Sequence, residues 1–124
     1  MQQETIENYC KTVFELDAGE GVKSVDIADA LKISKISVSI TLHKLRDESY
    51  IDMKRYGRVK LTDKGKCVAR RISGKHKAIE DFLEHCLGLE RKKALSEACA
   101  IEHHLSDDTV KKLTNFCNQM SKKK

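Results

Sequence analysis

The sequence predicts a mostly α-helical chain with one small β-hairpin. A winged helix-turn-helix is expected over residues 1–72 and an all-helical unit over residues 73–124. Three observations lead to this prediction. Apolar residues recur at helical spacing along most of the 124 residues. Only Lys32 and Ile33 separate two short helical patterns, which is typical of a helix-turn-helix. Directly after these patterns, the period changes from helical to alternating.

Three helices are expected before this change of period. The first is expected to end near Gly19 and Gly21, and its apolar face consists of Ile6, Tyr9, Cys10, Val13 and Phe14. Ser24 is expected to cap the second helix, whose inner residues are Val25, Ala28 and Leu31. Ser34 begins the third, recognition helix, whose inward residues are Val38, Leu42 and Leu45.

A β-hairpin wing and three more helices complete the prediction. Residues 51–54 and 59–61 alternate as strands do, and the turn between them holds Gly57, where a positive φ is expected. Thr62 is expected to cap a long helix that runs to about residue 86, with the stripe Val68, Ile72, His76, Ile79 and Leu83. The next helix carries Ala94, Leu95, Ala98, Ile101 and Leu105. Ser106 is expected to cap the last helix, which carries Val110, Leu113, Cys117 and Met120.

The composition excludes several classes of protein. Hydrophobic residues make up 40% of the chain, which is enough for a packed core and argues against general disorder. The sequence has no Gly-rich phosphate loop and no G-x-S-x-G elbow. Its five cysteines form no C-x-x-C pair, so we expect free thiols that are mostly buried. No signal peptide and no apolar run of membrane-spanning length are visible, so the expected compartment is the cytoplasm.

Positive charge is concentrated where a DNA backbone would lie. The net charge is −4 over residues 1–33, +7 over 34–72 and +2 over 73–124. The middle segment holds the recognition helix and the wing, so double-stranded DNA is the expected partner. Ile36 and Ile40 are one turn apart and suit thymine methyl groups. The full set of expected DNA-binding residues is Ser34, Lys35, Ile36, Ser37, Ile40 and Lys44 on the helix, with Arg55, Arg58 and Lys60 on the wing.

A possible metal site follows from the spacing of ligating side chains. Cys99, Glu102 and His103 are spaced i, i+3, i+4, which places a thiol, a carboxylate and an imidazole together on one helical face. His76 and Glu80 form a second such pair on the long helix. An ordinary explanation stays open, in which the cysteine fills the core and the other side chains are paired or solvated.

The sequence resembles the DtxR/MntR family of metal-dependent transcriptional repressors, named after the diphtheria toxin repressor, over nearly its whole length. The most specific match joins residues 75–83 to the Glu97-Ala98-Cys99 and Glu102-His103-His104-Leu105-Ser106 motifs. Further matches occur at residues 8–16, 25–31, 37–45 and 56–65. The resemblance implies a winged helix-turn-helix followed by a metal-binding and dimerisation domain. It also implies a homodimer on a pseudo-palindromic operator, with a divalent metal as corepressor in iron or manganese homeostasis.

The resemblance also implies roles for individual residues. Cys99 occupies the position of Cys in iron-type members and of Glu in manganese-type members, and Glu102 and His103 match ligands of both branches. His76 matches the ligand on the long helix, and Glu80 matches the carboxylate that joins it in the iron-type ancillary site. Three positions depart from the pattern, namely Asn8 (Met or Asp in the family), Lys11 (a second carboxylate in manganese-type members) and Leu95 (a second His in the ancillary site). We also expect the chain to lack the SH3-like third domain of longer members.

The resemblance places Asn8, Cys99, Glu102 and His103 around a metal that joins the first helix to the second domain. Fe²⁺ is favoured because a thiolate is a soft ligand, while Mn²⁺, Zn²⁺, Co²⁺ and Ni²⁺ stay possible. Neither an enzymatic activity nor a small organic substrate is expected. Three alternatives stay open: a metal-independent winged-helix regulator, a small metalloenzyme, and a zinc-storage or structural module.

Overall fold

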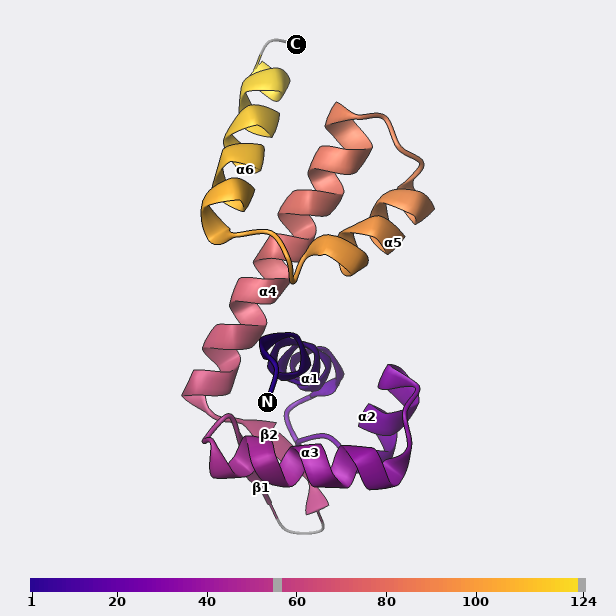
Figure 1. Cartoon of the computed structure of the whole chain (residues 1–124), viewed down its shortest axis with the longest axis vertical. Helices are drawn as coiled ribbons and strands as arrows, with labels where there is room; N and C mark the ends of the chain where they lie inside the picture. The colour runs from indigo at the N-terminus through magenta and orange to yellow at the C-terminus, as the bar shows by residue number, and fades with distance from the viewer. Residues whose placement is uncertain (55–56, 123–124) are drawn as a thin grey trace. The chain divides into compact units, whose positions relative to one another are not determined.

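The structure is a computed structural model that describes residues 1–54 and 57–122, and it confirms the predicted fold class (Figure 1). The chain divides into two compact units, Met1–Arg70 and Arg71–Lys124. The elements of the first unit are α1 (Gln3–Leu16), α2 (Ser24–Leu31), α3 (Lys35–Asp47), β1 (Ile51–Met53) and β2 (Val59–Leu61). Helix α4 (Asp63–Asp81) leads into the second unit, and η2 (Phe82–Cys86), α5 (Arg91–Ile101) and α6 (Asp107–Lys122) follow it.

Helix α1 ends earlier than the sequence predicts. Asp17, which follows it, has extended backbone angles, and its carboxylate accepts hydrogen bonds from the N–H groups of Gly19 at 2.7 Å and Gly21 at 3.0 Å. The hydrogen bond from Gly19 holds the pKa of Asp17 below its usual range. Both glycines have a positive φ, so they form the loop after the helix rather than its last turn.

The turn between α2 and α3 gives the helix-turn-helix its form. Ser34 is the N-cap of α3, as predicted, because its Oγ accepts a hydrogen bond from the N–H of Ser37 at 3.1 Å. The prediction that Ser24 caps α2 is wrong: Ser24 is the first residue of the helix, and Lys23 precedes it. Lys32 ends α2 in the left-handed region, with φ of 57°.

The core of the first unit lies between α1, α2, α3 and the hairpin. The inward residues predicted for α3 are all buried, namely Val38, Leu42 and Leu45. The prediction for Phe14 is wrong, since 41% of it is exposed at the edge of the α1 stripe. Ile27 is fully buried, although the sequence analysis did not assign it to the inner face of α2.

Strands β1 and β2 form the predicted antiparallel wing, with Ile51 opposite Leu61 and Met53 opposite Val59. Val22 exchanges two backbone hydrogen bonds with Val59, at 2.9 and 2.8 Å, and so ties the loop after α1 to the wing. Gly57 has the expected positive φ of 70°. The predicted turn residue Arg55 lies outside the described residues.

Helix α4 begins against the backbone of the wing. Thr62 caps it as predicted, because its Oγ1 accepts from the N–H of Gly65 at 3.2 Å. A Cβ atom at Gly65 would collide with the carbonyl oxygen of Tyr50, so this position requires glycine. The long helix extends to residue 86 as predicted, but its last turn is the π-helical η2 rather than α-helix.

In the second unit, α5 and α6 both pack against η2 and lie on either side of the C-terminal part of α4 (Figure 1). Ile79, Ala98 and Val110 form its buried core. Ser106 caps α6 as predicted, since its Oγ accepts from the N–H of Thr109 at 3.1 Å. Helix α5 stops at Ile101, so Leu105 lies beyond the helix to which the sequence analysis assigned it.

The exposure of the five cysteines differs from the prediction. The prediction that the cysteines are mostly buried is wrong: Cys10 alone is buried, Cys67 and Cys99 are exposed, and Cys86 and Cys117 are intermediate. Burial raises the pKa of the Cys10 thiol to about 12.

Across residues 1–54 and 57–122, no helix combines the length and the apolar character that a membrane crossing requires.

Candidate metal centre and DNA-binding surface

Three ligating side chains of the second unit converge, from α4, from α5 and from the residue after α5. One ligand atom each of His76, Cys99 and Glu102 lies within 4.8 Å of the others. Nδ1 of His76 is 2.6 Å from Oε2 of Glu102 and 3.8 Å from Sγ of Cys99. The two parts of the candidate site that are far apart in the sequence are therefore brought together.

Glu102 is the most buried member of the cluster. It follows the last residue of α5 and keeps helical backbone angles, φ −59° and ψ −30°. Its side chain therefore continues the helical spacing from Cys99 although the helix has ended. Only 1% of Glu102 is exposed, and Nε2 of His103 lies 3.4 Å from its Oε1. A carboxylate this deeply buried needs positive partners, and imidazoles lie beside both of its oxygens.

Glu80 contacts the opposite side of the His76 ring. Its Oε2 is 3.4 Å from Nε2 of His76, one helical turn earlier on α4. The two ring nitrogens thus have different surroundings: Nδ1 faces the thiol and the Glu102 carboxylate, and Nε2 faces Glu80. A carboxylate on the far nitrogen is the usual arrangement for orienting a histidine that binds metal through the near one.

The donor set fits a divalent transition metal. Thiolate, imidazole and carboxylate are all established ligands for such ions. A cation beside Nδ1 of His76 would be balanced by the Glu102 carboxylate and the Cys99 thiolate, so the charges that burial makes costly would be paired. His76, Cys99 and Glu102 are therefore the residues that would hold the ion.

Two other positions were singled out from the sequence, one in each unit. Asn8 lies on α1 of the first unit, where it lines a cavity of about 310 Å³ together with Thr5, Tyr9 and Ser37. Leu95 is 45% exposed on α5, which is more than a side chain of the predicted inner face should be.

The outer face of α3 presents the expected DNA-binding side chains. Ile36 is 76% exposed and Ile40 53% exposed, although both are large and apolar. Ser34 donates a hydrogen bond to Oγ of Ser37 at 3.0 Å. The other exposed members of the set on this helix are Lys35 and Lys44. Two apolar side chains this exposed suggest a surface that a partner covers.

Arg58 and Lys60, the two described members of the expected DNA-binding set on the wing, are engaged within the first unit. Nη1 of Arg58 donates to the carbonyl of Gly21 at 3.4 Å, and Nζ of Lys60 donates to that of Gly19 at 2.8 Å. From the sequence we expected these side chains to contact the DNA backbone or the minor groove. Both also support the loop after α1.

An ion pair between a buried lysine of α4 and an exposed aspartate of α6 was not predicted from the sequence. Lys75 is only 9% exposed, and its Nζ lies 3.3 Å from Oδ1 of Asp107. Nη1 of Arg71 lies 3.9 Å from the other carboxylate oxygen. The position of Lys75 next to His76, between Ile72 and Ile79 on the apolar stripe, was the signal for its burial.

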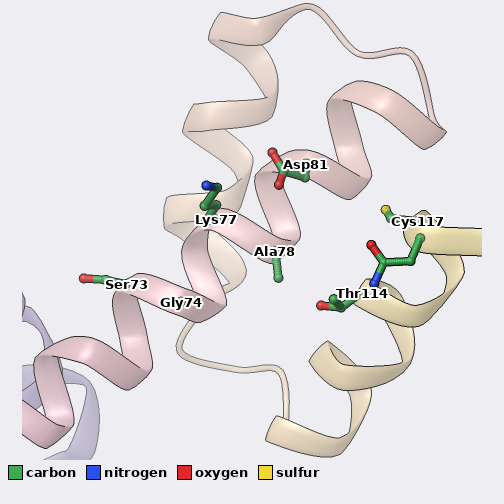
Figure 2. Close-up of a pocket in the computed structure, with 8 residues that line it drawn as sticks. Ser73, Gly74, Lys77, Ala78, Asp81, Thr114 and Cys117 are labelled. Carbon is green, nitrogen blue, oxygen red and sulfur yellow. The ribbon is translucent and has the colours of Figure 1, made fainter. Parts of the chain in front are cut away.

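A groove of about 490 Å³ lies between α4 and α6 in the second unit (Figure 2). Ala78 of α4 and Thr114 of α6 point into it, and Lys77, Asp81 and Cys117 also line it. None of the metal-cluster residues is among its lining residues, so the groove is a separate feature.

Two family models match the chain, and together they cover almost all of it. Residues 1–59 match the iron dependent repressor N-terminal DNA binding domain. Residues 62–124 match the iron dependent repressor metal binding and dimerisation domain.

Individual relatives agree with these models. An uncharacterised HTH-type transcriptional regulator from Methanocaldococcus jannaschii is 34% identical over 122 residues, covering 97% of this chain and 98% of its own. The HTH-type transcriptional regulator MntR from Bacillus subtilis is 31% identical, covering 91% of this chain and 80% of its own.

Solved structures show the same fold. The manganese regulator SloR superposes with a TM-score of 0.79 at 32% identity, covering 91% of this chain. ScaR with bound Zn²⁺ superposes with a TM-score of 0.79 at 29% identity, again covering 91% of this chain. This chain spans about half the length of each, 53% in both cases.

Proposed function

The chain belongs to the family of iron-dependent repressors, which includes the MntR regulators, and from that premise we propose that it is a metal-dependent DNA-binding transcriptional repressor. In this proposal residues 1–72 bind the operator, and residues 73–124 bind metal and form the homodimer. The observation that carries the proposal is the convergence of His76, Cys99 and Glu102 in the second unit.

The proposed corepressor is a divalent transition metal, with Fe²⁺ favoured. The thiolate of Cys99 is softer than the carboxylates and carbonyls that suit Mn²⁺, and it favours ions later in the first transition row. Among the similar proteins, SloR is described as a manganese regulator, and ScaR has been solved with bound Zn²⁺. Zn²⁺, Co²⁺, Ni²⁺ and Mn²⁺ are therefore the ions to compare with Fe²⁺.

The proposal assigns different roles to the surrounding side chains. His76, Cys99 and Glu102 bind the ion directly. His103, whose ring contacts the Glu102 carboxylate, is the further ligand that the resemblance implies. Glu80 orients His76 through Nε2, and this role replaces that of a direct ligand. Asn8 is a proposed ligand from the first unit, which would make metal binding sensitive to the arrangement of both units.

The proposed operator contact is made by α3 and supported by the wing. Ile36 and Ile40 are exposed one turn apart and are suited to thymine methyl groups in the major groove. Ser34, Lys35, Ser37 and Lys44 provide polar and positive contacts to bases or phosphates. Arg58, Lys60 and the undescribed Arg55 are assigned to the DNA backbone at the wing. In a homodimer, the two recognition helices would read half-sites about one helical turn apart.

Metal activates DNA binding only if it binds the DNA-competent arrangement more tightly than the alternatives. A tenfold gain in operator affinity requires about 1.4 kcal/mol of coupling between the two sites. The named relatives are transcriptional regulators, and the proposed role needs no catalytic step. A regulator of transcription acts on the chromosome, so the proposal includes a cytoplasmic location.

The test is operator selection followed by metal titration. A random double-stranded DNA library is enriched on the full chain with Fe²⁺ under anaerobic conditions, and affinity is then measured by fluorescence anisotropy. We expect a pseudo-palindromic site, bound at least tenfold more tightly with Fe²⁺ than with EDTA. Stronger activation by Mn²⁺ than by Fe²⁺ would contradict the metal preference.

Matched variants separate the proposal from its alternatives. We expect Cys99→Ala to lose activation by metal, whereas Ser96→Ala, an exposed position on the same helix, should keep it. An affinity for the operator that does not change when EDTA is added would favour a metal-independent regulator. Loss of helical circular dichroism on chelation would instead favour a structural metal site.

A further inference from the structure

Two cysteines of the second unit are in direct contact, away from the metal cluster. Sγ of Cys86, the last residue of η2, lies 3.0 Å from Sγ of Cys117 in α6. The residues are 31 positions apart in the chain, so their contact depends on the packing of η2 against α6. Both are free thiols of intermediate burial.

An aromatic pair keeps these two segments in place. The rings of Phe82 in η2 and Phe116 in α6 meet edge to face, with centroids 6.1 Å apart and planes at 64°. Phe116 directly precedes Cys117, and Phe82 begins the π-helical turn that ends at Cys86. The thiols are thus held together by packing that does not involve the sulfur atoms themselves.

A small molecule can reach this pair through the groove between α4 and α6. Cys117 is one of the residues that line this cavity of about 490 Å³, and Figure 2 shows its side chain on α6 among the other lining residues. Cys10 is different, because it is fully buried in the core of the first unit. Contact between the sulfurs and access to one of them are the two conditions that a reversible thiol pair requires.

We propose that Cys86 and Cys117 form a reversible intramolecular disulfide when the protein meets a hydroperoxide, and that this cross-link stabilises the second unit. The sulfur atoms are already close enough that only a short further approach would form the bond. The bond would close the chain segment from 86 to 117, which contains all of α5 and the cluster residues Cys99 and Glu102.

The chemistry balances with the hydroperoxide as oxidant. One thiolate attacks a peroxide oxygen; the O–O bond breaks, a sulfenic acid forms, and the departing hydroxide or alkoxide takes up the proton that the thiol lost, which gives water or an alcohol. The second sulfur attacks the sulfenic sulfur; the S–O bond breaks, the S–S bond forms, and the hydroxide takes the thiol proton and leaves as water. The two electrons lost by the sulfurs reduce the peroxide, and a dithiol reverses the change by exchange.

The surroundings of the pair set its rate of response. Burial and the hydrogen bond with Cys86 raise the pKa of Cys117 to about 11. This thiol is therefore mostly protonated near neutral pH and is a slow nucleophile. The pair should respond to sustained rather than brief exposure to oxidant.

The test treats the full, metal-free chain with hydrogen peroxide and identifies the linkage by mass spectrometry of a non-reduced tryptic digest. We expect peptide 78–91, whose single cysteine is Cys86, joined to peptide 113–122, whose single cysteine is Cys117. The oxidised chain should melt roughly 5–15 °C above the reduced chain, because the closed loop restricts the unfolded state. Added dithiothreitol should return both properties to their starting values.

Matched variants make the result decisive. Cys86→Ser and Cys117→Ser should each abolish the linked peptides and the rise in Tm, whereas Cys67→Ser, at an exposed position on α4, should keep both. Circular dichroism of the reduced variants checks that they fold. Linkage through Cys99 or Cys67, a disulfide between chains, or an unchanged Tm would overturn the proposal. These readouts use neither metal nor DNA, so they are independent of the proposed function.

Discussion

Replacing Glu102 by Gln tests the buried carboxylate of the metal cluster with little change in volume. The wild-type side chain is 1% exposed and lies 2.6 Å from Nδ1 of His76. A hydrogen bond to a charged group contributes about 1.5–3 kcal/mol, and the amide oxygen of Gln retains part of it. We expect the metal-free variant to be less stable by about 1–2 kcal/mol, which is a fall of roughly 3–10 °C in Tm for a chain of this length.

The effect on the metal-loaded protein should be larger. An ion present at 100 times its Kd stabilises the wild type by about 2.7 kcal/mol, or roughly 8–14 °C in Tm. If removing one of the three converging donors weakens binding about 100-fold, the same ion concentration adds only about 0.4 kcal/mol to the variant. The metal-induced shift should then fall to roughly 1–2 °C.

Differential scanning fluorimetry with and without metal measures both quantities. Glu97→Gln, at an exposed position on α5, is the matched control and should behave as the wild type. A metal-induced shift in Glu102→Gln as large as that of the wild type would refute the assignment of Glu102 as a ligand.

Three further predictions follow from other parts of the chain. Cys99→Ser should weaken binding of Zn²⁺ at least tenfold more than binding of Mn²⁺, because it removes the soft ligand; competition with a chromophoric chelator measures both affinities, and equal losses would contradict the softness argument. Asp17→Ala should destabilise the chain by about 0.5–2 kcal/mol near pH 7, since its carboxylate holds the N–H groups of Gly19 and Gly21. The pKa of Asp17 is lowered by folding, so its contribution is complete above the unfolded pKa, about 3.9, and is lost as the pH falls through the folded value; urea unfolding of both proteins should converge in strong acid. Gly65→Ala should lower the free energy of unfolding by about 2 kcal/mol or more, because its Cβ would collide with the carbonyl oxygen of Tyr50. Gly74→Ala, whose Cβ meets no such neighbour, should instead stabilise α4 by about 0.5–1 kcal/mol. Chemical denaturation measures both changes, and equal effects of the two substitutions would disprove the collision.

Local signals in the sequence predict most of the fold. Helical spacing gave the inward residues Val38, Leu42 and Leu45 because α3 is amphipathic over its whole length. Thr62 and Ser106 were recognised as caps because an N-cap hydrogen bond joins residues only three apart. Such features depend on neighbours in the chain and need no knowledge of the tertiary structure.

The errors arise where tertiary contacts decide the outcome. Phe14 has the correct helical spacing but lies at the edge of the α1 stripe, where no neighbour covers it fully. Arg58 and Lys60 appeared to be free wing charges because the carbonyls that they contact lie about 40 residues away, in the loop after α1. The contact of Cys86 with Cys117 could not be predicted from the sequence either, since it depends on the packing of η2 against α6.

The candidate metal site lies between these two cases. The helical spacing of Cys99, Glu102 and His103 could be recognised in the sequence as a possible metal site, because the chain keeps helical backbone angles through Glu102. The spacing alone did not place His76 against this group, and the contact of Glu80 with Nε2 of His76 is seen only in the structure. The direct DNA contacts of the residues on α3 remain predictions.

The central claim is that metal binding and operator binding are coupled, and metal affinity measured with and without the selected operator tests it most directly. Thermodynamic linkage requires the operator to raise metal affinity by the same factor by which metal raises operator affinity. Isothermal titration calorimetry of the full chain should therefore give a Kd for Fe²⁺ at least tenfold lower with the operator present. An identical Kd in both titrations, at full operator occupancy, would contradict the account.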